Sequence, residues 1–316
     1  YRWQRRRLGY LMDGDQPAGG KWNFDASNRE PPDATDDDWP DPVRFALDST
    51  DRAVIDDLPD AAFGSPPDGT WGTTRAQALE RLAEFLEFRL PRFGPQQDAM
   101  LSDHWSMRHS LISPYLNLGL LHPGEVCDAV EHAYRTGHIP IESAEGFIRQ
   151  VIGWREYVWG VYWMWMPDYR GLNALDAELP LPPVFTTGKT QMRCVEATLR
   201  AVAQHGYAHH IQRLMIIANL GLIAGIRPTE LSSWMRTSFV DGGDWVMQPN
   251  VIGMGLYADG GMMSTKPYAA GGNYISKMSD YCTSCPFNPK KRTGPDACPF
   301  TTLYWDFLDR NGAALA

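Results

Sequence analysis

Apolar residues recur with helical spacing along most of the chain after residue 73. In "TTRAQALERLAEFLEFRL" they fall three or four residues apart, at Ala78, Leu82, Phe85 and Leu86. Thr73 or Thr74 would be the N-cap of this helix, and Pro91 is expected to end it because proline disrupts a helix interior. Further helical patterns lie at about 106–120, 123–136, 143–166, 190–204, 207–225 and 228–236. Few segments alternate with the period of a strand, so the pattern predicts a mainly α-helical fold.

Residues 13–70 show little periodicity and are rich in proline, glycine and aspartate, as in "EPPDATDDDWPDP" and "GSPPDG". This composition predicts a long and mostly irregular connector. Four aromatic residues give the connector points of attachment to a core: Trp22, Phe24, Trp39 and Phe45. Residues 1–12 are expected to hold the end of a helix. We therefore predict a connector over 1–70 that docks on the core, followed by a helical domain over 71–316.

Composition supports a folded protein. Of the 316 residues, 43% are apolar and 12% aromatic, which is enough for a substantial core. No stretch approaches the roughly 20 apolar residues of a membrane span, and no signal peptide is evident. Five cysteines in a chain of this length do not suggest a secreted disulfide scaffold. We expect a reducing compartment, the cytoplasm, and no membrane association.

The net charge of −9 argues against a protein that coats DNA over its whole surface. The charge is nevertheless unevenly distributed. Residues 1–70 carry 8 Lys and Arg against 15 Asp and Glu, whereas residues 188–292 carry 11 against 6. A basic region on an acidic protein is compatible with a nucleic-acid partner, and equally with an ordinary solvated surface.

The segment "YCTSCPFNPKKRTGPDACPF" contains Cys282, Cys285 and Cys298. Four thiolates can hold a tetrahedral zinc ion or an iron–sulfur cluster, and the fourth would come from Cys127 or Cys194. The spacing alone does not choose between the two metals. The alternative is a set of buried, inert thiols.

Two stretches carry groups that suit a phosphorylated cofactor. "HSLISPYLNLGLLHPGEV" places three side chains where a helix is expected to begin, a setting that favours phosphate: His109, Ser110 and Ser113. "EGFIRQVIGWREYVWGVYW" places four on one helix: Gln150, Trp154, Arg155 and Tyr157. Arg155 could clamp a pyrophosphate, and Trp154 offers a stacking plane. The alternative is that these helices carry only packing aromatics and surface charges.

Two further stretches, "HHIQRLM" and "FVDGGDWVMQPN", offer an arginine and an aspartate that could pair near a cofactor. Taken together and in this order, the motifs closely resemble the catalytic domain of the photolyase/cryptochrome superfamily. "GGKWNFDASNR", "SPYLNLGLLHP", "EGFIRQVIGWREYVWG", "TGKTQMRC", "AHHIQRLM" and "YCTSCPFNP" look like its iron–sulfur branch, the bacterial cryptochromes and prokaryotic (6-4) photolyases. The resemblance covers essentially the whole chain.

The resemblance implies an all-helical domain that binds FAD in a bent, U-shaped form. It also implies a [4Fe–4S] cluster in the region 188–316, with Cys127 left free and with ligands Cys194, Cys282, Cys285 and Cys298. Arg213 and Asp241 would form a salt bridge beside the flavin. The complete set of implied flavin contacts is His109, Ser110, Ser113, Gln150, Trp154, Arg155, Arg213, Asp241 and Met247.

The resemblance further implies a lesion pocket in which His210 occupies the place of a histidine. Tyr268 and Tyr274 are expected to border this pocket, and Lys266 is expected to lie near a DNA phosphate. Family members also carry an N-terminal α/β domain, which in this branch often binds a lumazine antenna. The chain is expected to begin where that domain ends, so an antenna would require a domain outside these residues.

Three positions depart from the pattern of the branch. The residue that faces flavin N5, usually glutamate, falls on Met247. The tyrosine that usually follows the flavin-proximal tryptophan, Trp234, falls on Met235, and a further electron-relay tryptophan falls on Thr186. Methionine is only a weak hydrogen-bond acceptor, so photoreduction by the usual route is in question.

The first functional prediction is a light-driven, FAD-dependent DNA photolyase that repairs (6-4) pyrimidine photoproducts, with His210, Trp234, Tyr268 and Tyr274 as its catalytic residues. Its partner would be UV-damaged DNA, and we expect a monomer in a bacterial cytoplasm. A second reading is a cryptochrome-like light sensor, or a flavin and iron–sulfur protein of other chemistry. A third is a zinc-stabilised helical binding module without flavin.

Overall fold

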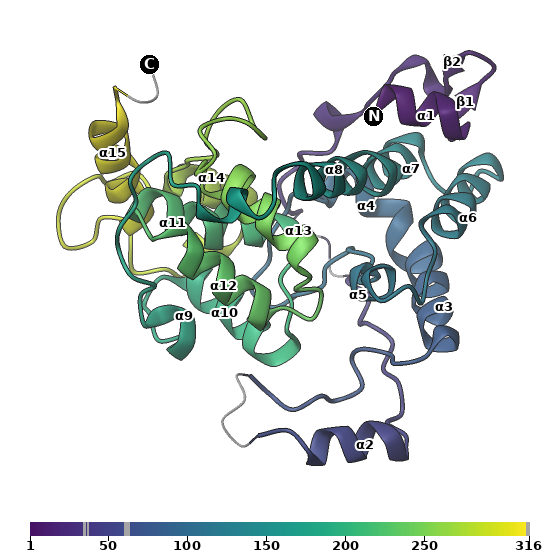
Figure 1. Ribbon diagram of the computed structural model, residues 1–316, viewed down its shortest axis with the longest axis horizontal. Coiled ribbons are helices and arrows are strands. Elements are labelled where there is room, and N and C mark those ends of the chain that lie inside the picture. The colour runs from purple at the N-terminus through teal and green to yellow at the C-terminus, as the bar shows by residue number, and fades with distance from the viewer. Residues whose placement is uncertain (34–35, 37, 60–63, 314–316) are drawn as a thin grey trace. The chain divides into compact units, whose positions relative to one another are not determined.

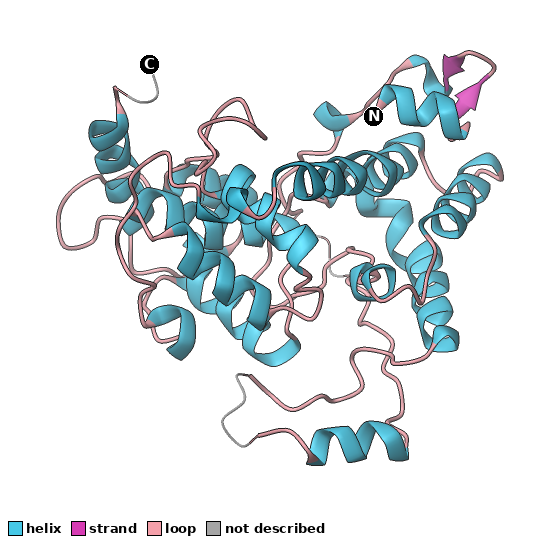
Figure 2. Ribbon diagram, in the orientation of Figure 1, coloured by secondary structure: helices cyan, strands magenta, loops and turns pink. Residues whose placement is uncertain are grey.

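A computed structural model describes residues 1–33, 36, 38–59 and 64–313 (Figure 1). Helices dominate these residues, as Figure 2 shows, and the strands described form a single two-stranded ribbon. The predicted mainly α-helical fold is confirmed. No helix in the described part of the chain is both long enough and apolar enough to cross a bilayer.

The chain forms two compact units, each of which is described by itself. The first unit comprises Tyr1–Ala99 and Ser106–Tyr157, and the second comprises Met100–Trp105 and Val158–Ala316. The boundary predicted at residue 70 falls inside the first unit. The described residues of the predicted connector are therefore grouped with the helices that follow them.

The elements of the first unit are α1 (Arg2–Leu8), β1 (Met12–Asp13), β2 (Gln16–Pro17), η1 (Ala18–Gly20), η2 (Asp25–Ser27), α2 (Ser49–Asp56), α3 (Arg75–Glu84), η3 (Phe85–Arg89), α4 (Leu90–Gln96), α5 (Ser113–Asn117), α6 (Pro123–Arg135), α7 (Ile141–Ile148) and η4 (Arg149–Trp154). The strands β1 and β2 pair antiparallel, with Met12 opposite Pro17. Apolar faces of α3, α4, α6 and α7 supply most of this unit's core, which includes Leu82, Phe85, Phe93, Val130 and Phe147.

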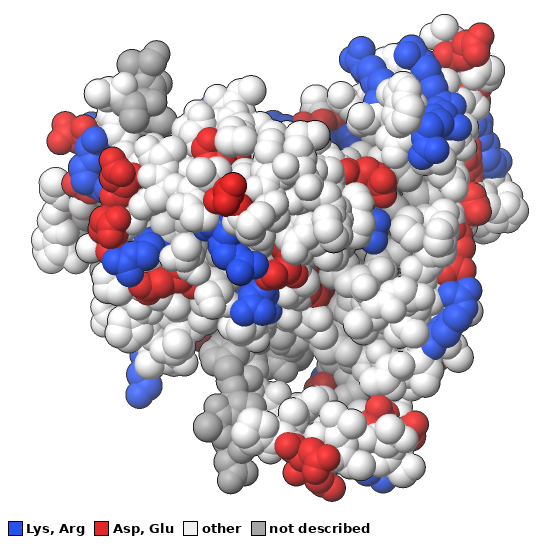
Figure 3. All heavy atoms as spheres, viewed as in Figure 1, with Lys and Arg blue, Asp and Glu red and all other residues white. Residues whose placement is uncertain are grey.

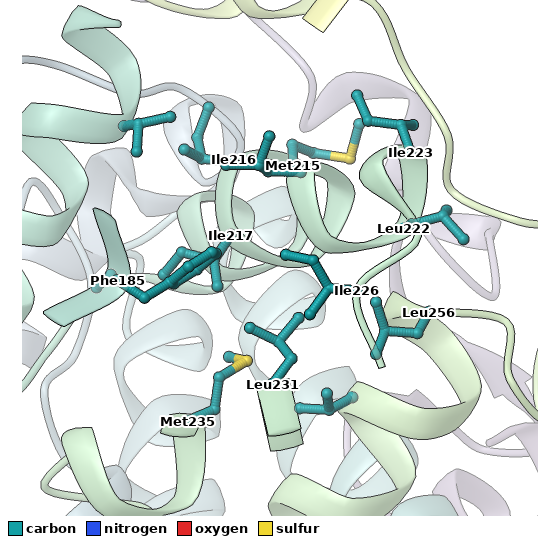
Figure 4. Packing of buried hydrophobic residues seen from close by; sticks show 14 of the residues in the cluster. Phe185, Met215, Ile216, Ile217, Leu222, Ile223, Ile226, Leu231, Met235 and Leu256 are labelled. Carbon is teal, nitrogen blue, oxygen red and sulfur yellow. The ribbon is translucent and has the colours of Figure 1, made fainter. Parts of the chain in front are cut away.

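The helix α8 (Arg155–Trp165) continues from η4, and the boundary between the units falls within it. The other elements of the second unit are η5 (Asp168–Gly171), α9 (Val184–Thr187), α10 (Arg193–His205), η6 (Gln212–Ala218), α11 (Asn219–Ala224), α12 (Pro228–Ser238), α13 (Asp244–Gln248), η7 (Pro249–Gly255), α14 (Gly272–Met278), η8 (Tyr281–Thr283) and α15 (Pro299–Asn311). Figure 4 shows part of the core, in which Ile217, Ile226, Leu231 and Met235 lie close together.

The helix that begins after Thr74 does not end at Pro91. Thr74 caps α3 in a capping box with Gln77, as expected for an N-cap residue. The backbone then widens into the π-helical turn η3 and continues as α4 with Pro91 as its second residue. Arg89, with φ −110°, opens the turn before the proline, and this gives the ring the space that a regular helix interior denies it.

The helix predicted at 106–120 is reduced to the five residues of α5. Met107 and Leu111 both adopt positive φ, 41° and 56°, which no α-helix can contain. The helix begins at Ser113 immediately before Pro114, and proline favours the first turn of a helix.

The described part of the predicted connector contains an α-helix that the sequence analysis missed, α2. Its N-cap residue, Asp48, accepts hydrogen bonds from the amides of Thr50 and Asp51. The side chain of Asp51 in turn accepts from the Asp48 amide, which completes a capping box. An aspartate in place of the usual glutamate at the third position concealed this signal.

Candidate functional site

Four cysteines converge in the second unit. Cys194 is the second residue of α10, Cys282 lies in η8, Cys285 follows in the next loop, and Cys298 caps α15. All four line one cavity, together with Met192, Gly272, Ile275, Tyr281, Phe287, Pro299 and Phe300. The cavity is mainly apolar apart from the thiols, and the cysteines are free rather than disulfide-bonded.

The thiols lie close enough to influence one another. Burial raises the pKa of Cys194 well above its usual value, and the neighbouring thiols Cys298, Cys282 and Cys285 raise it further. Four thiols that converge without disulfides are a fitting donor set for a tetrahedral metal ion or an iron–sulfur cluster. They fit the metal site that the sequence predicted.

A glycine that the sequence analysis did not single out helps to build this site. A Cβ atom at Gly272 would lie 2.8 Å from the Cys298 sulfur and 3.0 Å from the Thr301 hydroxyl oxygen. The Gly272 amide instead donates a hydrogen bond to that hydroxyl oxygen, at 3.0 Å. The Gly-Gly pair in "AAGGNY" was the available signal, because glycine permits such a close approach of the backbone.

Cys127 is separate from this set. It lies in α6 of the first unit, fully buried in the apolar core. Burial raises the pKa of its thiol to about 12, with smaller contributions from Asp128 and Glu131. Cys127 does not line the cavity of the other four cysteines, and its having no metal to bind stays a prediction.

The second unit contains the expected ion pair between Arg213 and Asp241. Two guanidinium nitrogens of Arg213 donate to the two carboxylate oxygens of Asp241, at 2.9 and 3.1 Å. A third nitrogen donates to the Ala208 carbonyl at 2.6 Å, and the ring of Phe239 lies beneath the guanidinium at 4.3 Å. Such a pair presents charge in a fixed orientation. Its contact with a flavin stays a prediction.

Two consecutive histidines precede this arginine. His209 is fully buried, and burial lowers its pKa well below the usual value, with Arg213 and His210 adding to the effect. His210 is exposed, and its ring meets that of His209 edge to face at 6.2 Å between centroids. Of the two rings, only that of His210 is accessible to a partner.

The three positions that depart from the pattern of the branch lie in α9, α12 and α13. Met247 in α13 and Met235 in α12 are 3% exposed. Trp234 is also buried, and its ring meets Phe185 edge to face at 5.1 Å. The neighbouring Thr186 is exposed at the end of α9. The buried rings that meet Trp234 include those of Phe185 and Phe239, neither of which the sequence analysis identified as its partner.

The remaining predicted residues of the second unit lie on or near its surface. Tyr268 is 36% exposed in an irregular segment, Tyr274 is half-buried in α14, and Lys266 is exposed. Tyr268 and Lys266 are thus accessible to solvent, whereas Tyr274 is partly covered. Their role at a lesion pocket stays a prediction.

In the first unit, His109 is buried and its ring meets Phe93 edge to face at 5.8 Å. Ser110 is half-buried, and Ser113 begins α5 as the sequence predicted. These residues follow the bend at Met107 rather than forming part of a long helix.

The second predicted group of the first unit does lie on one continuous helical stretch, formed by α7, η4 and α8. Gln150, Trp154 and Arg155 are half-buried there, and the rings of Trp154 and Tyr157 are 5.7 Å apart. Burial lowers the pKa of Arg155, while the Glu156 carboxylate, 3.6 Å away, partly offsets this effect. A guanidinium held in such a setting fits an anionic group such as a pyrophosphate.

Known proteins resemble this chain along nearly its whole length. Residues 1–71 match the family described as deoxyribodipyrimidine photo-lyase-related protein. A (6-4) photolyase of Agrobacterium fabrum is 48% identical over 98% of this chain and 62% of its own length. The chain thus spans less than two thirds of that relative.

Two solved structures share the fold. A bacterial class III photolyase from Agrobacterium tumefaciens aligns with a TM-score of 0.58 at 19% identity, over 77% of this chain and 56% of its own. A cryptochrome of Synechocystis sp. PCC6803 aligns with a TM-score of 0.51 at 20% identity, over 58% of this chain and 40% of its own. From the sequence identity, the matched family and the shared fold, we conclude that the chain belongs to the photolyase/cryptochrome superfamily.

Proposed function

We propose that this chain is the catalytic part of a FAD-dependent, light-driven DNA photolyase that repairs (6-4) pyrimidine photoproducts. The observation that carries the proposal is the 48% identity to a (6-4) photolyase along 98% of the chain. We expect UV-damaged DNA as the partner, and a monomer that acts in the cytoplasm.

FAD fits the chemistry of two sets of residues. In the first unit, the half-buried guanidinium of Arg155 and the hydroxyl groups of Ser110 and Ser113 suit phosphate oxygens. In the second unit, the bidentate pair of Arg213 and Asp241 suits the polar edge of a flavin ring. When bound in its reduced form, FAD supplies an electron to the lesion under blue light.

The chain's own residues would bind and orient the damaged bases. A lesion inside the base stack is out of reach, so the bases must be flipped out of the duplex. Lys266 is exposed and suits a DNA phosphate, while Tyr268 and Tyr274 offer aromatic faces for unstacked bases. We propose that His210 exchanges a proton with the lesion, because its ring is exposed whereas that of His209 is fully buried.

We further propose a [4Fe–4S] cluster on Cys194, Cys282, Cys285 and Cys298. The convergence of four free thiols on one cavity supports a metal, and the resemblance to the iron–sulfur branch favours iron over zinc. Iron and sulfide analysis of protein purified without oxygen tests this choice. About four iron atoms per chain are expected, and one zinc atom with no iron would contradict it.

One experiment tests the photolyase proposal as a whole. The absorption spectrum of the purified protein should show flavin bands and a broad cluster shoulder, and a colourless protein would favour the zinc-stabilised binding module. The reduced protein should then restore a (6-4) lesion in an oligonucleotide under blue light but not in the dark. A coloured protein that leaves the lesion intact would overturn the repair activity.

The second candidate is a relative that senses light without repair, and the specific observation in its favour is the pair of buried methionines. Met247 and Met235 make their surroundings apolar, where an acid and a tyrosine are usual in the branch. Met247→Glu together with Met235→Tyr should speed photoreduction with an external donor. If the natural protein reduces as fast as the double variant in time-resolved absorption, this candidate loses its support.

A further inference from the structure

A basic surface on α1 is not part of the proposed site. We define the α1 surface as Arg2, Trp3, Arg6, Arg7 and Lys21, all of which are exposed. Figure 3 shows lysine and arginine side chains gathered over α1, at the top right. This concentration stands out in a chain whose net charge is −9.

The charges of the α1 surface are not neutralised by neighbouring carboxylates. Most arginines of the chain form ion pairs, such as Arg75 with Glu125 and Arg135 with Asp13. Within the described residues, no ion pair involves Arg2, Arg6, Arg7 or Lys21. Of the two aspartates of the adjacent ribbon, Asp13 pairs with Arg135, and no described ion pair joins Asp15 to the α1 surface.

The helix is held firmly beneath this surface by a different arginine. Arg5 is fully buried and donates to the carbonyl groups of Leu11 at 2.6 Å and Trp22 at 3.0 Å. These bonds fasten the residues after α1 to its inner face. The exposed arginines are therefore presented by an anchored helix rather than by a loose end, which lowers the entropy lost on binding.

Aromatic rings are interleaved with the charges. The guanidinium of Arg6 lies over the Trp22 ring, 4.6 Å from its centroid, and Arg7 lies 5.3 Å from that of Trp3. Trp3 is 69% exposed. Unpaired arginines with an exposed tryptophan are typical of surfaces that follow a nucleic-acid backbone.

We propose that the α1 surface contacts the phosphate backbone of DNA outside the lesion pocket, an inference that rests on the proposed function for its choice of DNA. Charged side chains on a short exposed helix suit phosphates, so we expect the contact to add affinity without sequence preference. An anionic membrane fits less well. The seven-residue helix offers only Trp3 and Leu8 as large exposed apolar groups, too few for an interfacial helix.

The test is the salt dependence of binding to an undamaged DNA duplex, measured by fluorescence anisotropy. Each phosphate contact contributes about 0.9 to the slope of log affinity against log salt. Arg6→Ala should make this negative slope shallower by about one. The triple variant Arg2→Ala/Arg6→Ala/Arg7→Ala should make it shallower by about two to three. The triple variant should also bind roughly tenfold more weakly at low salt. Arg6→Lys should keep most of the slope.

Arg52→Ala is the matched control, because Arg52 is exposed on α2 of the same unit among Asp51, Asp56 and Asp57. It should leave the slope unchanged, and all variants should melt at the temperature of the natural protein. Unchanged affinity and slope in the triple variant of a protein that still repairs lesions would overturn this inference alone. A protein that repairs nothing but depends on the α1 surface for duplex binding would overturn the proposed function alone. Stronger binding to phosphatidylserine vesicles than to DNA, lost in the triple variant, would overturn the choice of partner.

Discussion

The two units gather different buried side chains: a network of arginines in the first and a set of cysteines in the second. In the first unit, Arg81 and Arg89 are fully buried and share the carboxylate of Glu84, at 2.9 and 2.5 Å. Their remaining donors reach backbone carbonyls of Val43, Thr70, Pro40 and Met107. In the second unit, four thiols from α10, η8 and α15 converge on one cavity instead.

The difference distinguishes buried charges that are paired within the fold from a group of thiols that could bind a metal. Arg81 and Arg89 find an ionic partner in Glu84 and acceptors in backbone carbonyls, so the chain itself satisfies most of their donors. Four thiols form only weak hydrogen bonds with one another, because a thiol is a weak donor and a weak acceptor. A bound metal ion or cluster would supply bonds that the thiols cannot make among themselves.

The largest effect is expected from Cys194→Ser, which removes the thiol most distant in sequence from the other three. A metal that joins α10 to the C-terminal segment closes a long loop, and its binding free energy counts toward folding, on the order of 10 kcal/mol in zinc-finger peptides. The variant should lose iron and most of its soluble yield. Iron content and thermal unfolding provide the measurement.

Cys127→Ser is the matched control, because it alters a buried thiol of the first unit that contacts none of the four. It should keep its iron and lose only some stability. Full iron retention in Cys194→Ser would sink the ligand assignment.

The next effect in size is expected from Glu84→Ala, which leaves Arg81 and Arg89 buried without their shared carboxylate. Breaking a buried ion pair from one side costs about 3–5 kcal/mol. Denaturant unfolding should show this loss, while the flavin and iron content of the folded fraction stay unchanged. A variant as stable as the natural protein would mean that the arginine network does not hold the first unit together.

Much of the fold could be predicted from sequence because amphipathic periodicity dominates the longer helices. The helices predicted at 123–136, 190–204 and 228–236 correspond to α6, α10 and α12. Pro91 was wrongly expected to end its helix. A π-helical turn before it relieves the clash of the proline ring with the preceding turn, and this widening leaves no trace in the apolar pattern. α2 was missed because its apolar pattern is weak and its capping box uses aspartate.

The candidate site was predictable to different degrees. Spacing alone predicted Cys282, Cys285 and Cys298 as candidate metal ligands, but no local pattern could select Cys194 over Cys127. That choice required the resemblance, and the structure brings Cys194 to the other three because α10 begins beside their cavity. The place of Phe185 against Trp234 depends on packing between distant helices, which the sequence does not encode locally.

A smaller effect, on flavin rather than on folding, is expected from Asp241→Ala. Arg213 is 18% exposed and keeps its bond to the Ala208 carbonyl, so the second unit should stay folded. If the pair contacts FAD, the loss of a charge-assisted hydrogen bond should weaken binding by about 1.5–3 kcal/mol, roughly tenfold to a hundredfold. The flavin-to-protein absorbance ratio after purification is the measurement.

Arg155→Ala tests the first unit in the same way and should also lower flavin retention, since it would remove a pyrophosphate contact. The contrast with Glu84→Ala is the informative one, because both acidic residues pair with arginine. Glu84→Ala should lower the free energy of unfolding and leave the flavin content unchanged. Asp241→Ala should lower the flavin content and leave the second unit folded. If Asp241→Ala and Arg155→Ala both purify with full flavin, the cofactor residues have been placed wrongly.

The smallest effect concerns Asp36, a buried carboxylate of the first unit. Burial alone would raise its pKa, but hydrogen bonds from Gln96 and Arg108 and the charges of Arg108 and Arg92 outweigh burial and lower it. A carboxyl group with a lowered pKa in the folded state stabilises the protein at neutral pH. That stabilisation is complete above its unfolded value of about 4 and is lost as the pH falls through the folded value.

Asp36→Asn keeps the shape of the side chain and removes its charge, so it should cost about 1–2 kcal/mol at pH 7. The difference in unfolding free energy between the natural protein and the variant should shrink as the pH is lowered below about 4, because protonation then removes the same charge from Asp36. Denaturant unfolding at a series of pH values measures this difference. A constant difference over the whole range would show that the charge of Asp36 does not stabilise the first unit, and that its arginine neighbours are held by their other partners.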